Sequence, residues 1–369
     1  GILCTMINGF GRRGYYNSQE IGLGRALARK GHEVMIYKGI DPSEKEEKVQ
    51  VEKNLTIWYL PMKHLGAHGF MDCKYLDPQL KALFCFGDQQ IFLPHVYRWC
   101  RRRRIPFVAY VGTAHSLDSN FKSKVMNALF AAGTLRIYKK NPVLAKTSAA
   151  KEELRQLGVP HAVIAPVGLD NAVLKKNIPA DEKMRLRKEH GFEADDVILC
   201  NVSRLSWEKR PLELIDLFLQ VKGKKKFKLI IVGNGPLEEE LNEKIRKNGL
   251  EKEVKIYPNV PYEKMWEIYE MSDYYLNMNK GEIFGMAIME AVYYKTSVAA
   301  IRALGPSVTL KDMKGHKLCE NDDEMAEWIT GPYPSEKDLQ ESSEKMAATF
   351  TWDRCADAFL QASSEKSSR

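Results

Sequence analysis

The sequence predicts an α/β protein made of two doubly wound domains, each with a parallel β-sheet covered by helices on both faces. Three observations support this prediction. Short, continuously apolar strand segments alternate with helical segments, as in parallel sheets that are buried on both sides. The alternation is interrupted by a charged stretch, residues 175–193, and then restarts. The chain also has 369 residues, which is too long for a single hydrophobic core.

The first half opens with an apolar run at residues 2–7 and a glycine-bearing turn at 8–14. A helix follows over 18–29, because Ile21, Leu23 and Leu27 recur there at helical spacing. Later apolar runs predict strands at 32–37, 55–60, 106–111 and 162–166.

The charged stretch at 175–193 predicts a linker with one surface helix. After it, strands are expected over 197–202, 227–232, 254–257, 274–276 and 297–301. Helices are expected between and after them, over 211–220, 237–247, 262–271 and 284–294. A final amphipathic helix is expected around 352–360. Two such sheets create a central cleft between their carboxyl ends, where ligands usually bind.

The charge is unevenly distributed along the chain. Residues 1–170 hold 25 Lys/Arg and 14 Asp/Glu, a net charge of +11, whereas the remainder is at −3. The basic half is expected to attract an anionic partner, although a solubilising surface explains the charge equally well. Seven scattered cysteines without a Cys-x-x-Cys pair favour a reducing cytoplasm, and no apolar run is long enough to span a bilayer.

Two glutamates, Glu282 and Glu290, stand eight positions apart in GEIFGMAIMEA. The second is expected on a helix, and the first in a turn opened by Gly281 and Gly285 before that helix begins. Such a turn brings backbone N–H groups, a carboxylate and a helix N-terminus together, which suits a ligand with phosphate and hydroxyl groups.

Two cations follow the strand that ends at Val202. Arg204 and Lys209 lie in the loop before a helix that Pro211 is expected to start, and together they can clamp a diphosphate. The alternative is a solvated basic loop. In the next strand-to-helix connection, Gly233 and Gly235 allow a ligand to approach the backbone, although a tight turn explains them equally well.

Several other classes of site are disfavoured. The loop at Gly9 and Gly11 lacks the full G-x-G-x-x-G spacing, and the sequence has no P-loop motif. No Asp-x-Asp motif or metal-ligating cluster is apparent, so a departing phosphate would be stabilised by protein cations and backbone dipoles. His115, with Asp118 near it, is expected at a strand end in the cleft, where it is either a ligand-binding or a structural histidine.

The ordered set of motifs resembles the retaining GT-B glycosyltransferases with a Glu-x7-Glu motif, a family with Rossmann-like domains that includes bacterial hexosyltransferases of capsule, exopolysaccharide and lipid-glycan assembly. The resemblance covers nearly the whole chain. The segments that carry it are the 9–14 loop, His115, residues 167–170, Ser203-Arg204 with Lys209, residues 232–236, residues 269–273 and Glu282-x7-Glu290.

The resemblance implies roles for individual residues. Arg204 and Lys209 would hold the donor diphosphate, Glu282 the transferred sugar and Glu290 the donor ribose. The backbone of Phe284, Gly285 and Met286 would contact the sugar and the phosphates, and Gly233 and Gly235 would contact the donor. Val260 and Tyr262 would contact the nucleobase. His115 would contact the C6 hydroxyl of the sugar, and Gly11 would contact the diphosphate. No cofactor and no metal would be required.

The resemblance also implies an organisation: an acceptor-binding domain over 1–172, a nucleotide-sugar-binding domain over 173–348, and a helix over 349–369, around Trp352, that crosses back to the N-terminal domain. The sequence departs from the family pattern at three places. A glycine is usual at 294–296 but is absent here, and the turn at 303–307 does not lead into the usual glutamate. Val167 stands where asparagine is frequent. These departures affect the fine donor contacts rather than the class.

The expected reaction is retaining transfer of a hexosyl unit from a nucleotide-diphosphate sugar, a UDP-sugar first and GDP-mannose next, to a glycan or lipid-linked acceptor in cell-surface polysaccharide assembly. A GT-B nucleotide-sugar epimerase and a catalytically silent sugar-nucleotide-binding protein are the alternatives, and nucleic-acid binding is disfavoured. Basic residues flank the apolar stretch 125–135: Arg101, Arg102, Arg103, Arg104, Lys122 and Lys124. They predict contact with a lipid-linked acceptor or with the anionic inner face of the plasma membrane. The alternative is a helix packed on its domain with a solvated basic edge.

Overall fold

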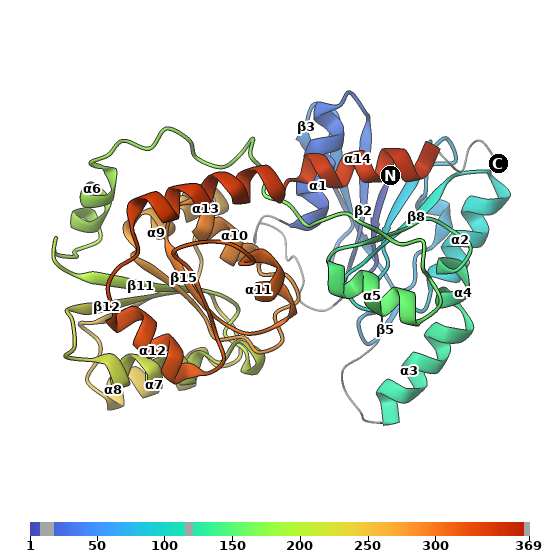
Figure 1. The fold of residues 1–369 in the computed structure, drawn as a ribbon. Helices are drawn as coiled ribbons and strands as arrows, with labels where there is room; N and C mark the ends of the chain where they lie inside the picture. The colour runs from blue at the N-terminus through green and yellow to red at the C-terminus, as the bar shows by residue number, and fades with distance from the viewer. Residues whose placement is uncertain (8–17, 115–120, 365–369) are drawn as a thin grey trace. The chain divides into compact units, whose positions relative to one another are not determined.

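The computed structural model divides the chain into two compact α/β units, and it describes residues 1–7, 18–114 and 121–364, with the side chains of Lys122 and Ser123 left out. The N-terminal unit comprises residues 1–170 and 351–369, and the C-terminal unit comprises residues 171–350. The chain therefore passes between the units twice, after Asp170 and after Phe350 (Figure 1).

The N-terminal unit is an eight-stranded sheet in the order β10-β9-β8-β7-β1-β2-β4-β3. All neighbouring strands are parallel except β3, which runs antiparallel to β4 at the edge. The strands are β1 (Ile2–Cys4), β2 (Val34–Ile40), β3 (Glu47–Glu52), β4 (Leu55–Pro61), β7 (Leu83–Phe86), β8 (Phe107–Val111), β9 (Val143–Ala145) and β10 (Val163–Ile164), with a separate hairpin of β5 (His64–Leu65) and β6 (His68–Gly69). The helices are α1 (Gln19–Arg29), α2 (Leu93–Arg102), α3 (Phe121–Ala132), α4 (Thr134–Tyr138), α5 (Ser148–Gln156) and α14 (Trp352–Ser364), with the 3₁₀ turn η1 (Cys73–Tyr75).

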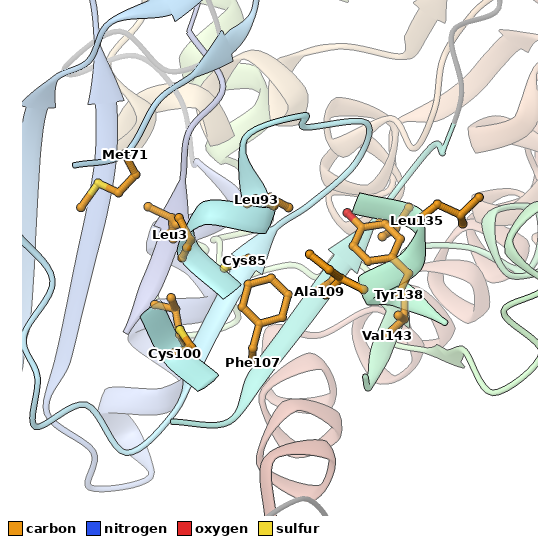
Figure 2. Packing of buried hydrophobic residues seen from close by; sticks show 14 of the residues in the cluster. Leu3, Met71, Cys85, Leu93, Cys100, Phe107, Ala109, Leu135, Tyr138 and Val143 are labelled. Atoms are coloured by element: carbon orange, nitrogen blue, oxygen red, sulfur yellow. The ribbon is translucent and has the colours of Figure 1, made fainter. Parts of the chain in front are cut away.

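The core of this unit lies between the sheet and the helices that cover one of its faces. Figure 2 shows side chains from β1, β7, β8 and β9 packed with Leu93 and Cys100 of α2 and with Tyr138 of α4. Every residue of β7 and β8 is buried, which explains why these strands read as continuous apolar runs.

Helix α14 belongs to the N-terminal unit although it ends the chain. Trp352 is fully buried against α1, where a Cβ on Gly22 would lie 2.7 Å from the indole Cε2 atom. Leu169 forms a parallel bridge with Thr351, and buried Asp170 accepts a hydrogen bond of 3.1 Å from Arg29. The segment at 167–170 thus fastens the start of α14 to its own unit.

The C-terminal unit is a six-stranded, wholly parallel sheet in the order β13-β12-β11-β14-β15-β16. The strands are β11 (Val197–Val202), β12 (Phe227–Val232), β13 (Val254–Tyr257), β14 (Tyr274–Asn277), β15 (Ser297–Ile301) and β16 (Lys317–Cys319). The helices are α6 (Glu182–Glu189), α7 (Pro211–Val221), α8 (Glu238–Lys247), α9 (Met265–Met271), α10 (Met286–Tyr293), α11 (Leu304–Thr309), α12 (Asp322–Thr330) and α13 (Glu336–Thr349), with the 3₁₀ turns η2 (Trp207–Lys209) and η3 (Tyr262–Lys264).

The elements predicted for the C-terminal unit are present, but both units contain elements that were not predicted, and the N-terminal unit also needed a change of bounds. Strand β1 ends at Cys4 rather than at residue 7, and Met6 makes only an isolated bridge to His68. Strands β3, β7, β9 and β16 and helices α2, α5 and α11–α13 were not predicted. Strands such as Leu83–Phe86 and Val143–Ala145 have three or four residues, too few to show a period.

Candidate functional site

The candidate site lies at the carboxyl edge of the C-terminal sheet. Strands β11 and β14 are neighbours and parallel, so the loops that follow them leave the sheet side by side. The loop after β11 carries Arg204 and Lys209, and the loop after β14 carries Glu282. Residues that are far apart in the sequence therefore meet at one edge.

The loop after β11 is held in place by a residue next to the predicted cations. Arg210 has a left-handed backbone (φ 56°), and its guanidinium donates two hydrogen bonds, of 3.0 and 2.8 Å, to the carboxylate of Asp322. Pro211 begins α7 at its first position, as the sequence predicts. Arg210 is thus a structural anchor, and it leaves Lys209 to face the other loop.

Lys209 and Glu282 form an ion pair. The Lys209 Nζ atom lies 2.9 Å from Glu282 Oε2, and the two side chains are 25% and 15% exposed. Burial by itself raises the pKa of Glu282, but the charge of Lys209 and hydrogen bonds from Lys209 and Asn279 lower it below its ordinary value. The Glu282 carboxylate is therefore ionised at neutral pH, where it can accept hydrogen bonds from a ligand.

The turn that carries Glu282 is built by two asparagines. The Asn277 side chain accepts a hydrogen bond of 3.0 Å from the backbone N–H of Asn279, whose own side chain accepts one of 2.9 Å from the N–H of Gly281. These are Asx turns, which asparagine favours. The sequence reasoning missed both residues, although an Asn-x-Asn pair directly after an apolar strand is a signal for such a turn.

Glycines let this turn lie close to α10 and to the following loop. Gly285 precedes α10 with a left-handed backbone (φ 84°) that a side chain rarely adopts. The N–H of Gly305 donates to the Glu282 carbonyl at 2.8 Å, and a Cβ at Gly305 would lie 2.5 Å from the backbone N of Phe284. Phe284 is buried and Met286 is half-buried at the start of α10.

Glu290 lies in the second turn of α10 and is 7% exposed. Its Oε2 atom accepts a hydrogen bond of 2.8 Å from the Tyr269 hydroxyl. Burial raises the pKa of Glu290 to about 7, against the lowering effect of hydrogen bonds from Tyr269 and Tyr262. Glu290 is therefore partly protonated near neutral pH and can donate as well as accept a hydrogen bond.

A hollow opens beside Glu290 within the C-terminal unit. Aromatic side chains from α9, the end of α10 and the η3 turn line it together with Lys175 and Glu290: Tyr262, Trp266, Tyr269 and Tyr294. The Lys175 ammonium lies 5.5 Å from the centre of the Trp266 ring. Tyr262 thus lines this hollow, whereas the half-buried Val260 is not among its lining residues.

Gly233 and Gly235 have a packing role in the structure. A Cβ at Gly233 would overlap the carbonyl oxygen of Ser203, and one at Gly235 would lie 2.8 Å from the carbonyl carbon of Leu205. The loops after β11 and β12 are therefore pressed together. Close packing accounts for both glycines, and their contact with a donor stays a prediction.

The remaining predicted residues fall into three groups. Arg204 is exposed in the loop after β11. Burial raises the pKa of the nearby Glu208, but a hydrogen bond from Ser206 and the charges of Lys209 and Arg204 lower it below its ordinary value. His115 and Gly11 lie outside the described residues. The basic residues of the N-terminal unit are spread over two helices, with Lys124 exposed on α3 and Arg101–Arg104 exposed at the end of α2.

The two basic segments are separated along α2. Pro94, at the start of α2, lies next to Gly133, which follows α3. The arginines are at the opposite end of this ten-residue helix, about 15 Å away at 1.5 Å per residue. Arg103 packs over the Trp99 ring at 4.6 Å. The arginine run therefore does not flank the apolar stretch as the sequence suggested.

Among the residues that the structure describes, no group of three or more His, Cys, Asp or Glu side chains is arranged to hold a metal ion. The charged groups of the candidate site are instead the Lys209–Glu282 pair, Arg204 and Glu290. A site with this composition can bind phosphate oxygens through its cations and hydroxyl groups through its carboxylates.

Fold and site together define a two-domain α/β protein that has cations and carboxylates side by side at the edge of one sheet, and these are residue types suited to phosphate and hydroxyl groups. Comparison with known proteins narrows this class. Residues 182–345, almost the whole C-terminal unit, match the family model "Glycosyl transferases group 1". The chain is 23% identical to a D-inositol 3-phosphate glycosyltransferase of Xylanimonas cellulosilytica, covering 98% of this chain and 94% of that protein. It is also 23% identical to an uncharacterized glycosyltransferase of Methanocaldococcus jannaschii, covering 75% and 74%.

Solved structures show the same fold. A sucrose-phosphate synthase from Thermosynechococcus elongatus superposes with a TM-score of 0.72 at 16% identity, covering 94% of this chain and 92% of that one. Anabaena HepE, solved with UDP and glucose, superposes with a TM-score of 0.69 at 16% identity, covering 100% and 99%. The predicted GT-B fold class is confirmed, and residues 182–345 are similar to the glycosyltransferases of group 1.

Proposed function

We propose that this protein is a retaining hexosyltransferase that uses a nucleotide-diphosphate sugar, with a UDP-sugar as the favoured donor and GDP-mannose next. The observation that carries the proposal is the Lys209–Glu282 ion pair at the carboxyl edge of the C-terminal sheet. It sets a diphosphate-binding cation beside a carboxylate that can accept from sugar hydroxyls. HepE, whose fold is similar, was solved with UDP and with UDP-glucose, which supports the choice of donor.

In this proposal the chemistry takes place on one face of the sugar. The acceptor hydroxyl attacks the anomeric carbon while the bond to the donor phosphate breaks, and the leaving phosphate oxygen takes the proton of the acceptor. Negative charge builds on that phosphate. Lys209 and Arg204 therefore stabilise the transition state more than the ground state, which is the condition for catalysis.

The donor would lie along α10. Glu282 binds hydroxyls of the transferred sugar, the first turn of α10 offers its N–H groups to the phosphates, and Glu290 binds the ribose hydroxyls. The aromatic hollow beside Glu290 supports a base-binding role for Tyr262. His115 and Gly11 remain assigned to the sugar and the diphosphate by resemblance.

The acceptor is a glycan or a lipid-linked glycan in cell-surface polysaccharide assembly. A relative named alpha-monoglucosyldiacylglycerol synthase, from Acholeplasma laidlawii, is 20% identical over 74% of this chain, and it supports a lipid-linked acceptor. Neither cofactor nor metal takes part, so turnover is expected to survive EDTA. Relatives named as glycosyltransferases favour this function over an epimerase or a silent binding protein.

A thermal-shift panel of UDP-, GDP- and ADP-sugars tests the donor, because a ligand that binds only the folded state raises the melting temperature. Lys209→Ala then tests the site. We expect kcat to fall by about 10²- to 10³-fold, as on removal of a group that stabilises developing charge. Lys314→Ala is the matched control, since Lys314 pairs with Glu341 on the exposed surface. Normal turnover by the Lys209 variant would refute the assignment.

A further inference from the structure

Trp207 stands exposed beside the cations of the candidate site. It begins the η2 turn two residues before Lys209 and is 67% exposed, whereas the other five tryptophans of the chain are buried or half-buried. Its indole makes no hydrogen bond, ring stack or cation contact with any other residue that the structure describes. Burial of an aromatic side chain of this size is strongly favourable, so an uncovered tryptophan marks a candidate binding surface.

The backbone that carries Trp207 is held firmly although its ring is not. Leu205 and Ser206 before it are buried, and the N–H of Leu205 donates to the Asn234 carbonyl at 2.9 Å. The Trp207 carbonyl accepts a hydrogen bond of 3.1 Å from the N–H of Arg210, the residue that anchors this loop. A ring presented on a fixed backbone is preorganised, because a ligand that covers it has little backbone to order.

Two more exposed apolar side chains lie on the neighbouring loops. Ile283, directly after Glu282, is 42% exposed, and Leu304, at the start of α11, is 55% exposed. The N–H of Gly305 donates to the Glu282 carbonyl at 2.8 Å, so these two loops touch. Strands β11, β14 and β15 are consecutive in the sheet, and the three loops that follow them leave it side by side. Trp207, Ile283 and Leu304 thus form an apolar rim around the Lys209–Glu282 pair.

Charged side chains interrupt the apolar rim, and they decide what kind of molecule fits it. Arg204 and Glu208 are exposed on the loop of Trp207, and Lys280 is exposed on the loop of Ile283. An alkyl chain would strip water from these charges without offering them a partner. A pyranose ring instead offers an apolar face of C–H groups to an indole and hydroxyl groups to the charges around it.

We propose that the apolar rim binds a glycan acceptor, with the terminal pyranose ring of the acceptor stacked on the indole of Trp207. The inference rests on the proposed function, because an acceptor hydroxyl has to reach the sugar held at Glu282. Two residues span at most about 7 Å, so the Cα atom of Trp207 lies within that distance of the Lys209 Cα atom. A second copy of the chain is a poorer occupant, because the three side chains expose on the order of 300 Å², against roughly 800 Å² per partner in a stable interface.

Fluorine NMR of the full chain labelled with fluorotryptophan tests the proposal, since each of the six tryptophans then carries its own reporter. Trp207→Phe and Trp266→Phe assign the two signals that matter. We expect the Trp266 signal to shift with UDP, because Trp266 lines the hollow beside Glu290. With UDP present, we expect the Trp207 signal to shift with methyl glycosides of β-D-glucose, β-D-galactose or α-D-mannose. Sorbitol, a polyol without a ring, should leave the Trp207 signal in place.

Substitution of Trp207 measures the contribution of the ring. Trp207→Ala should weaken glycoside binding, followed by saturation-transfer NMR, by about 2- to 10-fold, whereas Trp207→Tyr should retain most of it because it keeps an aromatic face. In a transfer assay the alanine variant should raise the KM for the acceptor. Met184→Ala removes an apolar side chain of 45% exposure from α6 and should leave glycoside binding unchanged. An unchanged melting temperature shows that the Trp207 variants are folded.

The two reporters separate this inference from the function on which it rests. If Trp266 responded to UDP while Trp207 responded to none of the three glycosides, the inference would fail and the donor site would stand. If neither signal moved, the donor site would fall and the inference with it. A Trp207 signal that shifts with octanol but not with glycosides would show a site for an alkyl chain instead. A signal that changes with protein concentration would show an interface between two copies.

Discussion

Glu290→Gln is the substitution for which the structure gives the sharpest expectation. Burial raises the pKa of Glu290 from 4.5 to about 7, which corresponds to about 3 kcal/mol of preference for the protonated form in the folded protein. Between these two pH values the folded protein holds a proton that the unfolded chain has lost. Its free energy of unfolding therefore falls by about 1.4 kcal/mol per pH unit as the pH rises, until Glu290 is ionised.

Glutamine removes this cost because it carries no charge at any pH. We expect Glu290→Gln to change stability little at pH 4 and to raise the free energy of unfolding by up to about 3 kcal/mol at pH 8. Donor affinity should fall at the same time, by about ten-fold, because a charge-assisted hydrogen bond to the ribose becomes a neutral one. Greater stability together with weaker binding is the expected sign of a residue kept for function.

Urea unfolding of wild type and variant at pH 4, 6 and 8 measures the difference, in which the other titrating groups cancel. Glu282→Gln is the matched control with the opposite sign. The charge of Lys209 and hydrogen bonds to the Glu282 carboxylate lower the pKa of Glu282, against the effect of burial. The Lys209–Glu282 pair therefore contributes to the free energy of unfolding above pH ~4.5, and this contribution is lost as the pH falls. A Glu290→Gln variant that is equally destabilised at every pH would refute the reasoning.

Three further substitutions test the loops around the site. Arg210→Ala should lower the free energy of unfolding by about 1–2 kcal/mol, because it removes the bidentate partner of the partly exposed Asp322 carboxylate; urea unfolding measures the loss. Lys295→Gly should raise stability by about 0.5–1 kcal/mol, since Lys295 follows α10 with a left-handed backbone (φ 61°), and differential scanning calorimetry would detect the higher melting temperature. Gly235→Ala should cost about 1–3 kcal/mol, measured in urea, because its Cβ would press on the Leu205 backbone.

Each of these has a control elsewhere in the chain. Lys314→Ala removes an exposed cation and should change stability by less than about 1 kcal/mol. Glu243→Gly, at an exposed position inside α8, should destabilise by about 1 kcal/mol, opposite in sign to Lys295→Gly. Gly281→Ala adds a Cβ that lies 3.7 Å from the Asn279 Oδ1 atom, an ordinary contact distance, and it should be tolerated in folding. If a variant and its control behaved alike, the stated contact would not be the cause.

Much of the C-terminal unit is determined by the sequence alone. Strands β11 and β15 and the start of α7 fall at the predicted residues, because continuous apolar runs end at polar loops and Pro211 marks a first helical turn. These are local signals. The Glu282-x7-Glu290 spacing likewise predicts one glutamate before a helix and one on it, as the structure shows.

The tertiary structure decided what these residues contact. Glu282 meets Lys209 across 73 positions of sequence, and Arg210 rather than Lys209 anchors its loop to Asp322; neither pairing can be read from spacing. Gly233 and Gly235 proved to be sites of close loop packing, and the arginine run proved to lie apart from α3. Local patterns specify backbone conformation, whereas the order of strands in a sheet, β11 beside β14, specifies which loops become neighbours.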